Sequence, residues 1–269
     1  MVKPGGGEYI DADGIRTYYV REGTGPNLLL LHGQPPGGSL HLIWHRNFDF
    51  FVKAGFAVTA FDQVGYGRSG HSLDYSRERR VVHAQAFIEA MGFEQYVPWG
   101  MSDGSNLACR LALQDPRIDR MILMASGSLS PRPASLTDAR HQEQAAERAS
   151  YVPSLANARA YLEHGLMNKA AITDGLVAEL HAMSTGKNQE AFEARHALPA
   201  TPPIYDEVYR IKVPTLLLWG RNDSGGAERG LLLFEKIPGA ELHVFDNCGH
   251  WVQVDQTERV NSLVLDFLR

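Results

Sequence analysis

Short apolar runs recur along the chain, and most of them lack the alternation of apolar and polar residues that marks a half-exposed strand. They stand at residues 28–31, 56–61, 96–99, 121–125, 213–219 and 241–245. Continuous apolar runs of this length are typical of strands that are buried on both faces. Apolar residues at helical spacing lie between them, as at 81–90 and 107–112. This alternation predicts an α/β fold, a mostly parallel twisted sheet with helices on both faces and right-handed crossovers.

The chain opens with a different pattern. Residues 8–12 and 15–20 flank Asp13 and Gly14, a pair that readily takes the positive φ angles of a tight turn. We therefore expect the first two strands to form an antiparallel hairpin at an edge of the sheet.

Between residues 130 and 205 the alternation of strands and helices stops. This stretch is rich in Ala, Glu, Arg, Gln and His, with helical candidates at 138–149, 155–167, 176–183 and 189–196. In open α/β folds ligands bind at the carboxyl ends of the strands. We therefore interpret residues 130–205 as a helical cap inserted over that edge, and residues 1–129 and 206–269 as the core.

The composition disfavours several classes of binding partner. The 269 residues are 44% hydrophobic and 21% charged, the formal net charge is −5, and no dense Lys/Arg cluster is present, which disfavours nucleic acid. No run of eighteen apolar residues occurs and residues 1–7 are polar and glycine-rich, so we expect no membrane partner, no secretory signal and a cytoplasmic location. Cys109 and Cys248 form no C-x-x-C pair, which predicts reduced thiols without a metal or redox role. A homo-oligomer is compatible with the sequence.

One short sequence motif indicates a candidate nucleophile. Gly100, Ser102 and Gly104 fill the pattern G-x-S-x-G directly after the apolar run 96–99 and before an apolar helical stripe. In a nucleophile elbow of this kind, the serine lies on a strained strand-to-helix turn. The positions two before and two after it must be small, because strand and helix approach closely there. The motif predicts Ser102 as a nucleophile.

Two features argue against Ser102 as the nucleophile. Asp103 is the rival nucleophile, but Met101 would then occupy a position that needs a small residue. Pro98 stands in the strand that enters the turn and cannot donate a ladder hydrogen bond.

His41 and His45 have the spacing of zinc ligands, but they lack the glutamate of H-E-x-x-H and a third ligand. We interpret these two histidines as residues of a pocket rim or of the surface.

The remaining catalytic groups follow later strands. Asp223 comes directly after the run 213–219, and His250 follows the run 241–245. The order serine, acid, histidine is the one that this kind of fold requires. Asp246 is an alternative acid, but it lies only four residues before the histidine. We therefore predict a triad of Ser102, Asp223 and His250.

The loop after the first buried strand, His32 to Gly38, is rich in turn-forming residues. Because this loop should lie beside the nucleophile, it can supply one donor of an oxyanion hole. Pro35 and Pro36 have no N–H to offer. The donors are therefore predicted to be the backbone N–H groups of Gln34 and of Asp103.

With these residues assigned, the chain resembles the α/β-hydrolase superfamily from Leu28 to Leu268. Within it, the chain looks most like the meta-cleavage product hydrolases, bacterial enzymes that hydrolyse carbon–carbon bonds in ring-fission products of aromatic catabolism. The resemblance is carried by residues 242–245 and 248–253, with support from residues 219–223 and the Pro36–Gly37 loop. It implies the α/β-hydrolase fold and a Ser-His-Asp triad.

Three departures from that family concern the substrate. Met101 stands where the family usually has an asparagine, and Gln34 and Pro35 replace a glycine-rich oxyanion loop. Leu180 and His181 occupy the segment in which the family's cap tends to carry an arginine that holds the substrate carboxylate. The resemblance therefore implies the fold and the triad more directly than the substrate.

We expect a cofactor-free serine hydrolase that cleaves a C–C or ester bond of a small aromatic or cyclic carbonyl compound, with an esterase or lactonase included. The predicted pocket residues are Gly33, Trp44, Met101, Leu180, His181 and Trp251, although core packing explains each aromatic residue equally well. No metal is expected. The alternatives are a cofactor-independent oxygenase on the same fold and a ligand-binding protein derived from a hydrolase. An intact serine, acid and histidine disfavour the binding protein.

Overall fold

The computed structural model describes residues 6–131, 151–199, 201 and 203–269. Within them, eight strands form one sheet in the order β1-β2-β4-β3-β5-β6-β7-β8. The strands are β1 Glu8–Ala12, β2 Ile15–Glu22, β3 Asn27–Leu31, β4 Ala57–Phe61, β5 Val97–Met101, β6 Met121–Met124, β7 Thr215–Gly220 and β8 Ala240–Phe245. β2 runs antiparallel to β1 and to β4, and every other pair is parallel. The predicted mostly parallel sheet with an edge hairpin is confirmed.

Two apolar cores cover the two faces of this sheet. Alternate leucines of β3 enter different cores, with Leu28 and Leu30 on one face and Leu29 and Leu31 on the other, and all four are fully buried. This placement explains why the run lacks polar residues. A strand with a helical layer on each side has no face left for water.

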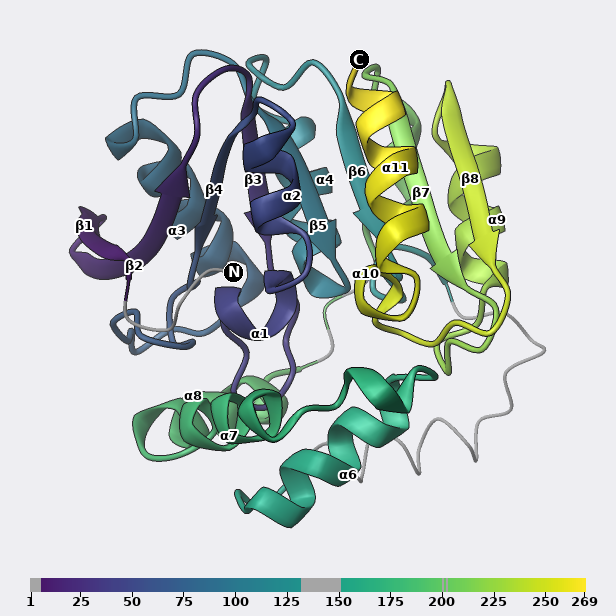
Figure 1. The fold of residues 1–269 in the computed structure, drawn as a ribbon. Coiled ribbons are helices and arrows are strands. Elements are labelled where there is room, and N and C mark those ends of the chain that lie inside the picture. The colour runs from purple at the N-terminus through teal and green to yellow at the C-terminus, as the bar shows by residue number, and fades with distance from the viewer. Residues whose placement is uncertain (1–5, 132–150, 200, 202) are drawn as a thin grey trace.

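The helices form a layer on each face (Figure 1). One face carries α1 Leu40–Trp44, α2 Phe48–Lys53, α10 Val252–Asp255 and α11 Thr257–Leu268. The other carries α3 Arg77–Ala90, α4 Asp103–Ala112 and α9 Glu228–Lys236. α3 begins four residues before the predicted helix 81–90, because Ser76 caps it by accepting a hydrogen bond from the Arg79 N–H.

Between β6 and β7 in the sequence, the described residues include three further helices. They are α6 Leu155–Gly165, α7 Asp174–Met183 and α8 Lys187–Ala197, and below we call them the inserted helices. Figure 1 shows them together beyond one end of the sheet. They match the predicted helices at 155–167, 176–183 and 189–196, whereas the helix predicted at 138–149 falls outside the described residues. Short 3-10 turns lie at Lys169–Ala171, Ile204–Asp206 and Val208–Arg210. The boundaries of the cap at residues 130 and 205 stay a prediction.

An ion pair fastens α7 to the sheet-bearing part of the chain. Both nitrogens at the end of Arg68 donate to the Glu179 carboxylate, at 2.9 and 3.0 Å, and the Ser39 hydroxyl donates to the same carboxylate at 2.9 Å. Gly37 lies so close to α7 that a Cβ there would collide with the Leu180 carbonyl oxygen. The loop after β3 and the loop after β4 therefore both support α7.

α8 contacts the same loop after β4. The Arg195 guanidinium donates to the Gly65 carbonyl oxygen and lies 3.7 Å from the centre of the Tyr66 ring. The Asn188 amide donates to the Gly67 carbonyl oxygen at 2.9 Å. The loop after β4 thus contacts both α7 and α8 of the inserted helices.

Within the described residues, no helix is both long enough and apolar enough to cross a membrane.

His83 of α3 makes stability dependent on pH. Its two ring nitrogens bond to the Val64 N–H and to the Thr17 hydroxyl, and burial lowers the pKa of the imidazole from 6.5 to about 3. Below pH 6.5 the unfolded chain therefore binds a proton that the folded chain excludes. We expect this group to lower the free energy of unfolding by up to about 1.4 kcal/mol per pH unit between those two pKa values. Urea unfolding at several pH values should give a flatter acid limb for His83→Gln, and parallel curves for variant and wild type would contradict this assignment.

Candidate active site

The turn at Ser102 has the geometry of a nucleophile elbow. Ser102 stands between β5 and α4 with φ 54° and ψ −120°, outside the regions that side-chain-bearing residues ordinarily adopt. A Cβ at Gly100 would collide with the backbone of Gly104 and Ser105. One at Gly104 would collide with the Leu31 carbonyl oxygen. The predicted need for small residues at both positions is confirmed.

Ser105, which the motif does not mark, holds this turn together. Its hydroxyl donates to the Gly100 carbonyl oxygen at 2.8 Å and accepts from the Met124 N–H at 2.9 Å. The Ser102 N–H donates to the Met124 carbonyl oxygen at 2.7 Å. Pro98 pairs with Leu29 in the ladder of β3 and β5, whereas the ladder of β5 and β6 begins only at Trp99. These bonds tie the strained turn to the neighbouring strand β6.

The predicted acid and base meet at the carboxyl ends of β7 and β8. His250 Nδ1 lies 3.1 and 3.2 Å from the two carboxylate oxygens of Asp223, whose side chain is 1% exposed. Asp246, the alternative acid, has a side chain that is 80% exposed and pairs with Arg221. Asp223 is therefore the carboxylate that can orient this imidazole.

The histidine loop is anchored to α6. The His250 N–H donates to the Gly165 carbonyl oxygen at 3.1 Å, and the Gly249 N–H donates to the Asp255 carboxylate at 2.7 Å. A Cβ at Gly165 would lie 2.9 Å from Nε1 of Trp251, so the indole packs against the end of α6. The inserted helices thus contact the loop that carries the predicted base.

Among the described residues, no hydrogen bond joins the Ser102 hydroxyl to the His250 ring. Catalytic hydrogen bonds are often long or poorly aligned without substrate and tighten in the complex. The contact between this serine and this histidine stays a prediction.

The loop after β3 lies beside Ser102. A Cβ at Gly33 would come within 3.0 Å of the Ser102 Cβ and of the Met101 carbonyl oxygen. No described residue accepts a hydrogen bond from the backbone N–H of Gln34 or from that of Asp103. The first N–H groups of a helix have no partner within the helix, so the Asp103 N–H is free to bind a substrate oxygen, and an oxyanion hole requires a second such donor beside it.

The side chain of Asp103 is bound elsewhere. Its carboxylate pairs with Arg77, at 3.0 Å, and with Arg80. Burial alone would raise the pKa of Asp103, but the two guanidinium charges lower it to about 2. A carboxylate held by two arginines is a poor nucleophile, so the structure favours Ser102 over its rival.

Comparison with known proteins agrees with this geometry. Residues 26–257 match the family model described as alpha/beta hydrolase fold. The chain is 34% identical to a 2-hydroxymuconate semialdehyde hydrolase of Pseudomonas putida, covering 97% of this chain and 94% of that one. It is 31% identical to a 2-hydroxy-6-oxononadienedioate/2-hydroxy-6-oxononatrienedioate hydrolase of Burkholderia vietnamiensis, over 96% and 93% of the two chains. A solved meta-cleavage product hydrolase of Pseudomonas fluorescens IP01 has 30% identity and a TM-score of 0.87, with 97% of each chain covered.

The chain belongs to the α/β-hydrolase family. Within that family it is a serine hydrolase of the meta-cleavage product hydrolase type.

Four of the predicted pocket residues of this hydrolase belong to one apolar cluster. Trp44, Met101, Leu180 and Trp251 are all at most 1% exposed and lie in the same core. The Trp44 ring packs against Trp99 with the ring centres 5.1 Å apart, an arrangement typical of core packing. His181 is half-buried and lies outside this cluster. The pocket lining of the hydrolase stays a prediction.

The histidine pair on α1 needs a correction. His41 is buried at 4% exposure and its Nε2 lies 3.1 Å from the Tyr18 hydroxyl, so it is not a surface residue. His45 is half-buried, and burial lowers its pKa to about 4. The surface alternative was wrong for His41 because α1 packs its whole length into the core of the hydrolase, and a place at a pocket rim stays a prediction for both histidines. In the described ranges, no group of three or more His, Cys, Asp or Glu residues is arranged to hold a metal ion.

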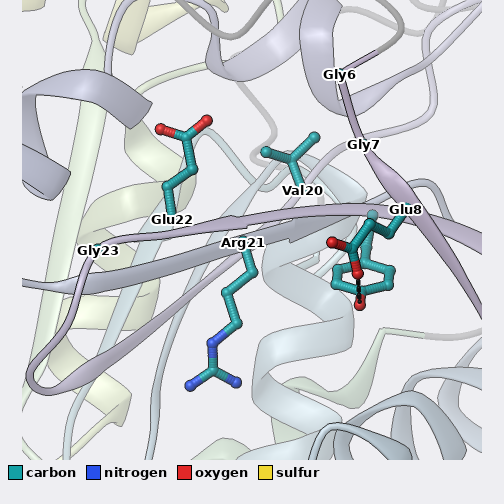
Figure 2. Close-up of a pocket in the computed structure, with 8 residues that line it drawn as sticks. Gly6, Gly7, Glu8, Val20, Arg21, Glu22 and Gly23 are labelled. Carbon is teal, nitrogen blue, oxygen red and sulfur yellow. Dashed lines mark hydrogen bonds between the residues drawn. The ribbon is translucent and has the colours of Figure 1, made fainter.

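A polar cleft of about 330 Å³ lies elsewhere on the hydrolase, along the edge hairpin of β1 and β2 (Figure 2). It is lined by Gly6, Gly7, Glu8, Tyr19, Val20, Arg21, Glu22 and Gly23. Inside it the Tyr19 hydroxyl donates to the Glu8 carboxylate at 2.8 Å. None of the predicted site residues lines this cleft.

The elbow gives a test of stability. We expect Gly104→Ala to lower the free energy of unfolding by about 3 kcal/mol, since the added methyl group collides with the backbone of β3. Gly175→Ala is the matched control, because a Cβ in that helical position meets nothing closer than 3.9 Å. The control should gain about 0.5 to 1 kcal/mol from helix propensity. Equal denaturation midpoints for both variants would contradict the close approach at the elbow.

Proposed function

We propose that Ser102, His250 and Asp223 are the catalytic triad of this hydrolase. The observation that carries the proposal is the contact between His250 Nδ1 and the buried Asp223 carboxylate. An imidazole that donates from Nδ1 has its Nε2 lone pair free to take the proton of a serine hydroxyl. Asp223 fixes this tautomer and stabilises the imidazolium that follows.

The backbone N–H groups of Gln34 and Asp103 form the oxyanion hole in this proposal. Support comes from the nearness of Gly33 to the Ser102 Cβ and from the absence of any described acceptor for either N–H. Two such donors stabilise the negative charge that develops on the carbonyl oxygen during attack. Loss of one donor typically costs about 2.7 to 4 kcal/mol of transition-state stabilisation.

The substrate that we propose is a ring-fission product with a vinylogous diketone. Relatives over nearly the whole chain are named as hydrolases of 2-hydroxy-6-oxononadienedioate and of 2-hydroxymuconate semialdehyde, which supports this class. His250 first helps to ketonise the dienol, so that the carbon leaving group departs as a stabilised carbanion. Ser102 attacks the carbonyl carbon, the C–C bond breaks, and water then hydrolyses the acyl-serine. With an ester or lactone, His250 instead protonates the departing alkoxide.

We also propose that residues 130–205 act as a cap and that Trp44, Met101, Leu180, His181 and Trp251 line the pocket with Gly33. The contacts of α6 with the histidine loop and of α7 with the loop after β3 support a cap over the site. A cytoplasmic location is supported by the free thiols of Cys109 and Cys248, both of which are buried.

The test uses Ser102→Ala, which removes only the nucleophile. We expect the loss of at least about 10³-fold in kcat on a coloured ring-fission product and on a 4-nitrophenyl ester, with the fold unchanged by circular dichroism. Ser262→Ala, on the exposed side of α11, is the control and should keep wild-type kcat. Undiminished turnover by Ser102→Ala would instead support a base-catalysed reaction without a serine nucleophile, as in a cofactor-independent oxygenase.

A further inference from the structure

A side-chain bond joins the two residues whose N–H groups are proposed to form the oxyanion hole. The Gln34 amide nitrogen donates to Oδ2 of Asp103 at 2.6 Å, across 69 positions of the sequence. The carboxylate can only accept, so the amide orientation is fixed by its partner. This bond holds the loop after β3 against the first turn of α4.

The Asp103 carboxylate is kept ionised and immobile by α3. Oδ1 accepts from Nε and Nη2 of Arg77, at 3.1 and 3.0 Å, while Oδ2 accepts from Nη1 of Arg80. Arg80 is only 2% exposed, and its remaining nitrogens donate to the Gln63 amide oxygen at 2.9 and 2.5 Å. The charge that holds Gln34 is therefore itself fixed by a buried network.

The same network fixes the direction of the peptide between Gly33 and Gln34. The Gln63 N–H donates to His32 Nε2 at 3.0 Å, which leaves the proton on Nδ1, and Nδ1 donates to the Gly33 carbonyl oxygen at 2.7 Å. Burial lowers the pKa of His32 to about 3, so this tautomer persists in neutral solution. In a planar trans peptide the C=O and N–H bonds point in opposite directions. The bond from His32 therefore turns the Gln34 N–H away from the imidazole.

Gln63 connects the Arg80 side chain to His32. Its amide nitrogen donates to the His32 carbonyl oxygen at 2.7 Å, while its amide oxygen holds Arg80. The ends of β3, β4 and β5 are thus linked through one chain of side-chain bonds. Among the residues in it, only Gln34 and Asp103 carry the proposed donors.

We propose that the Asp103 carboxylate is a positioning residue, which holds the Gln34 N–H at the oxyanion hole through the Gln34 side chain. This role rests on the proposed function, because it needs the hole to stabilise a transition state. In this proposal, the buried ion pairs of Asp103 serve catalysis as well as the stability of the fold. It also predicts that the Gln34 side chain matters for kcat even though only its backbone faces the substrate.

The first test is Gln34→Met, which keeps the volume and the backbone N–H but loses the amide donor. A donor that drifts by about 1 Å loses most of its effect on the transition state, so we expect kcat to fall about 10²-fold with KM within about twofold. Circular dichroism and urea unfolding show whether the variant is folded. A folded Gln34→Met with kcat within about twofold of wild type would overturn the proposal.

The second test adds a charge at the same position. In Gln34→Glu the new carboxyl faces Asp103, whose like charge raises the pKa of the introduced group, and also Arg80, whose positive charge lowers it. Ionised, it repels Asp103 and displaces the loop, whereas protonated it donates to Asp103 and restores the bond. The ratio of variant to wild-type kcat should therefore rise about tenfold as the pH falls through the pKa of the introduced carboxyl, in a profile measured from about pH 8 to about pH 4. Gln85→Glu, in α3 itself but at a side chain that bonds to Gln114, is the charge-matched control and should give a constant ratio.

These outcomes separate the two proposals. A ratio for Gln34→Glu that does not change with pH overturns the positioning role, even if Gln34→Met fails to fold. If Ser102→Ala is inactive while Gln34→Met keeps full kcat, the triad stands and only the positioning role fails. If Ser102→Ala keeps full kcat, the proposed function fails first.

Discussion

The close approach of three backbone segments at Gly100 and Gly104 is the constraint on which the site depends. β5 must reverse into α4 within one residue, and the loop after β3 must lie against that reversal. Any Cβ at these two positions would push the segments apart. The positive φ of Ser102 is maintained because Ser105 of α4 and Met124 of the neighbouring strand β6 both bind the turn. A strained backbone conformation of this kind persists only where many surrounding contacts hold it in place.

Local pattern was sufficient to predict the strands and the elbow. Each of these depends on residues that are neighbours in the sequence, such as the four leucines of β3 or the glycines around Ser102. The role of Asp103 could not be predicted in this way. Its partners Arg77, Arg80 and Gln34 lie 26, 23 and 69 positions away, and nothing in their local sequence marks them as a group. The burial of His41 was missed for the same reason, since its partner Tyr18 belongs to β2.

The loop after β4 contacts both the inserted helices and the hydrogen-bond network of Asp103, a link that the sequence alone did not indicate. Gly65 and Gly67 accept hydrogen bonds from α8, and Arg68 binds Glu179 of α7. Gln63, at the start of the same loop, holds Arg80 and thereby the Asp103 carboxylate. One short loop thus supports both the inserted helices and the network beneath the proposed oxyanion hole.

The central claim is that Ser102 forms a covalent intermediate with the substrate. The most direct measurement is mass spectrometry of peptides after rapid acid quench of the enzyme mixed with an excess of a 4-nitrophenyl ester. We expect an acyl adduct on the peptide that contains Ser102, mapped to the serine oxygen and absent when His250 is replaced by alanine. An adduct on Asp103, or on no residue of that peptide while turnover continues, would contradict it.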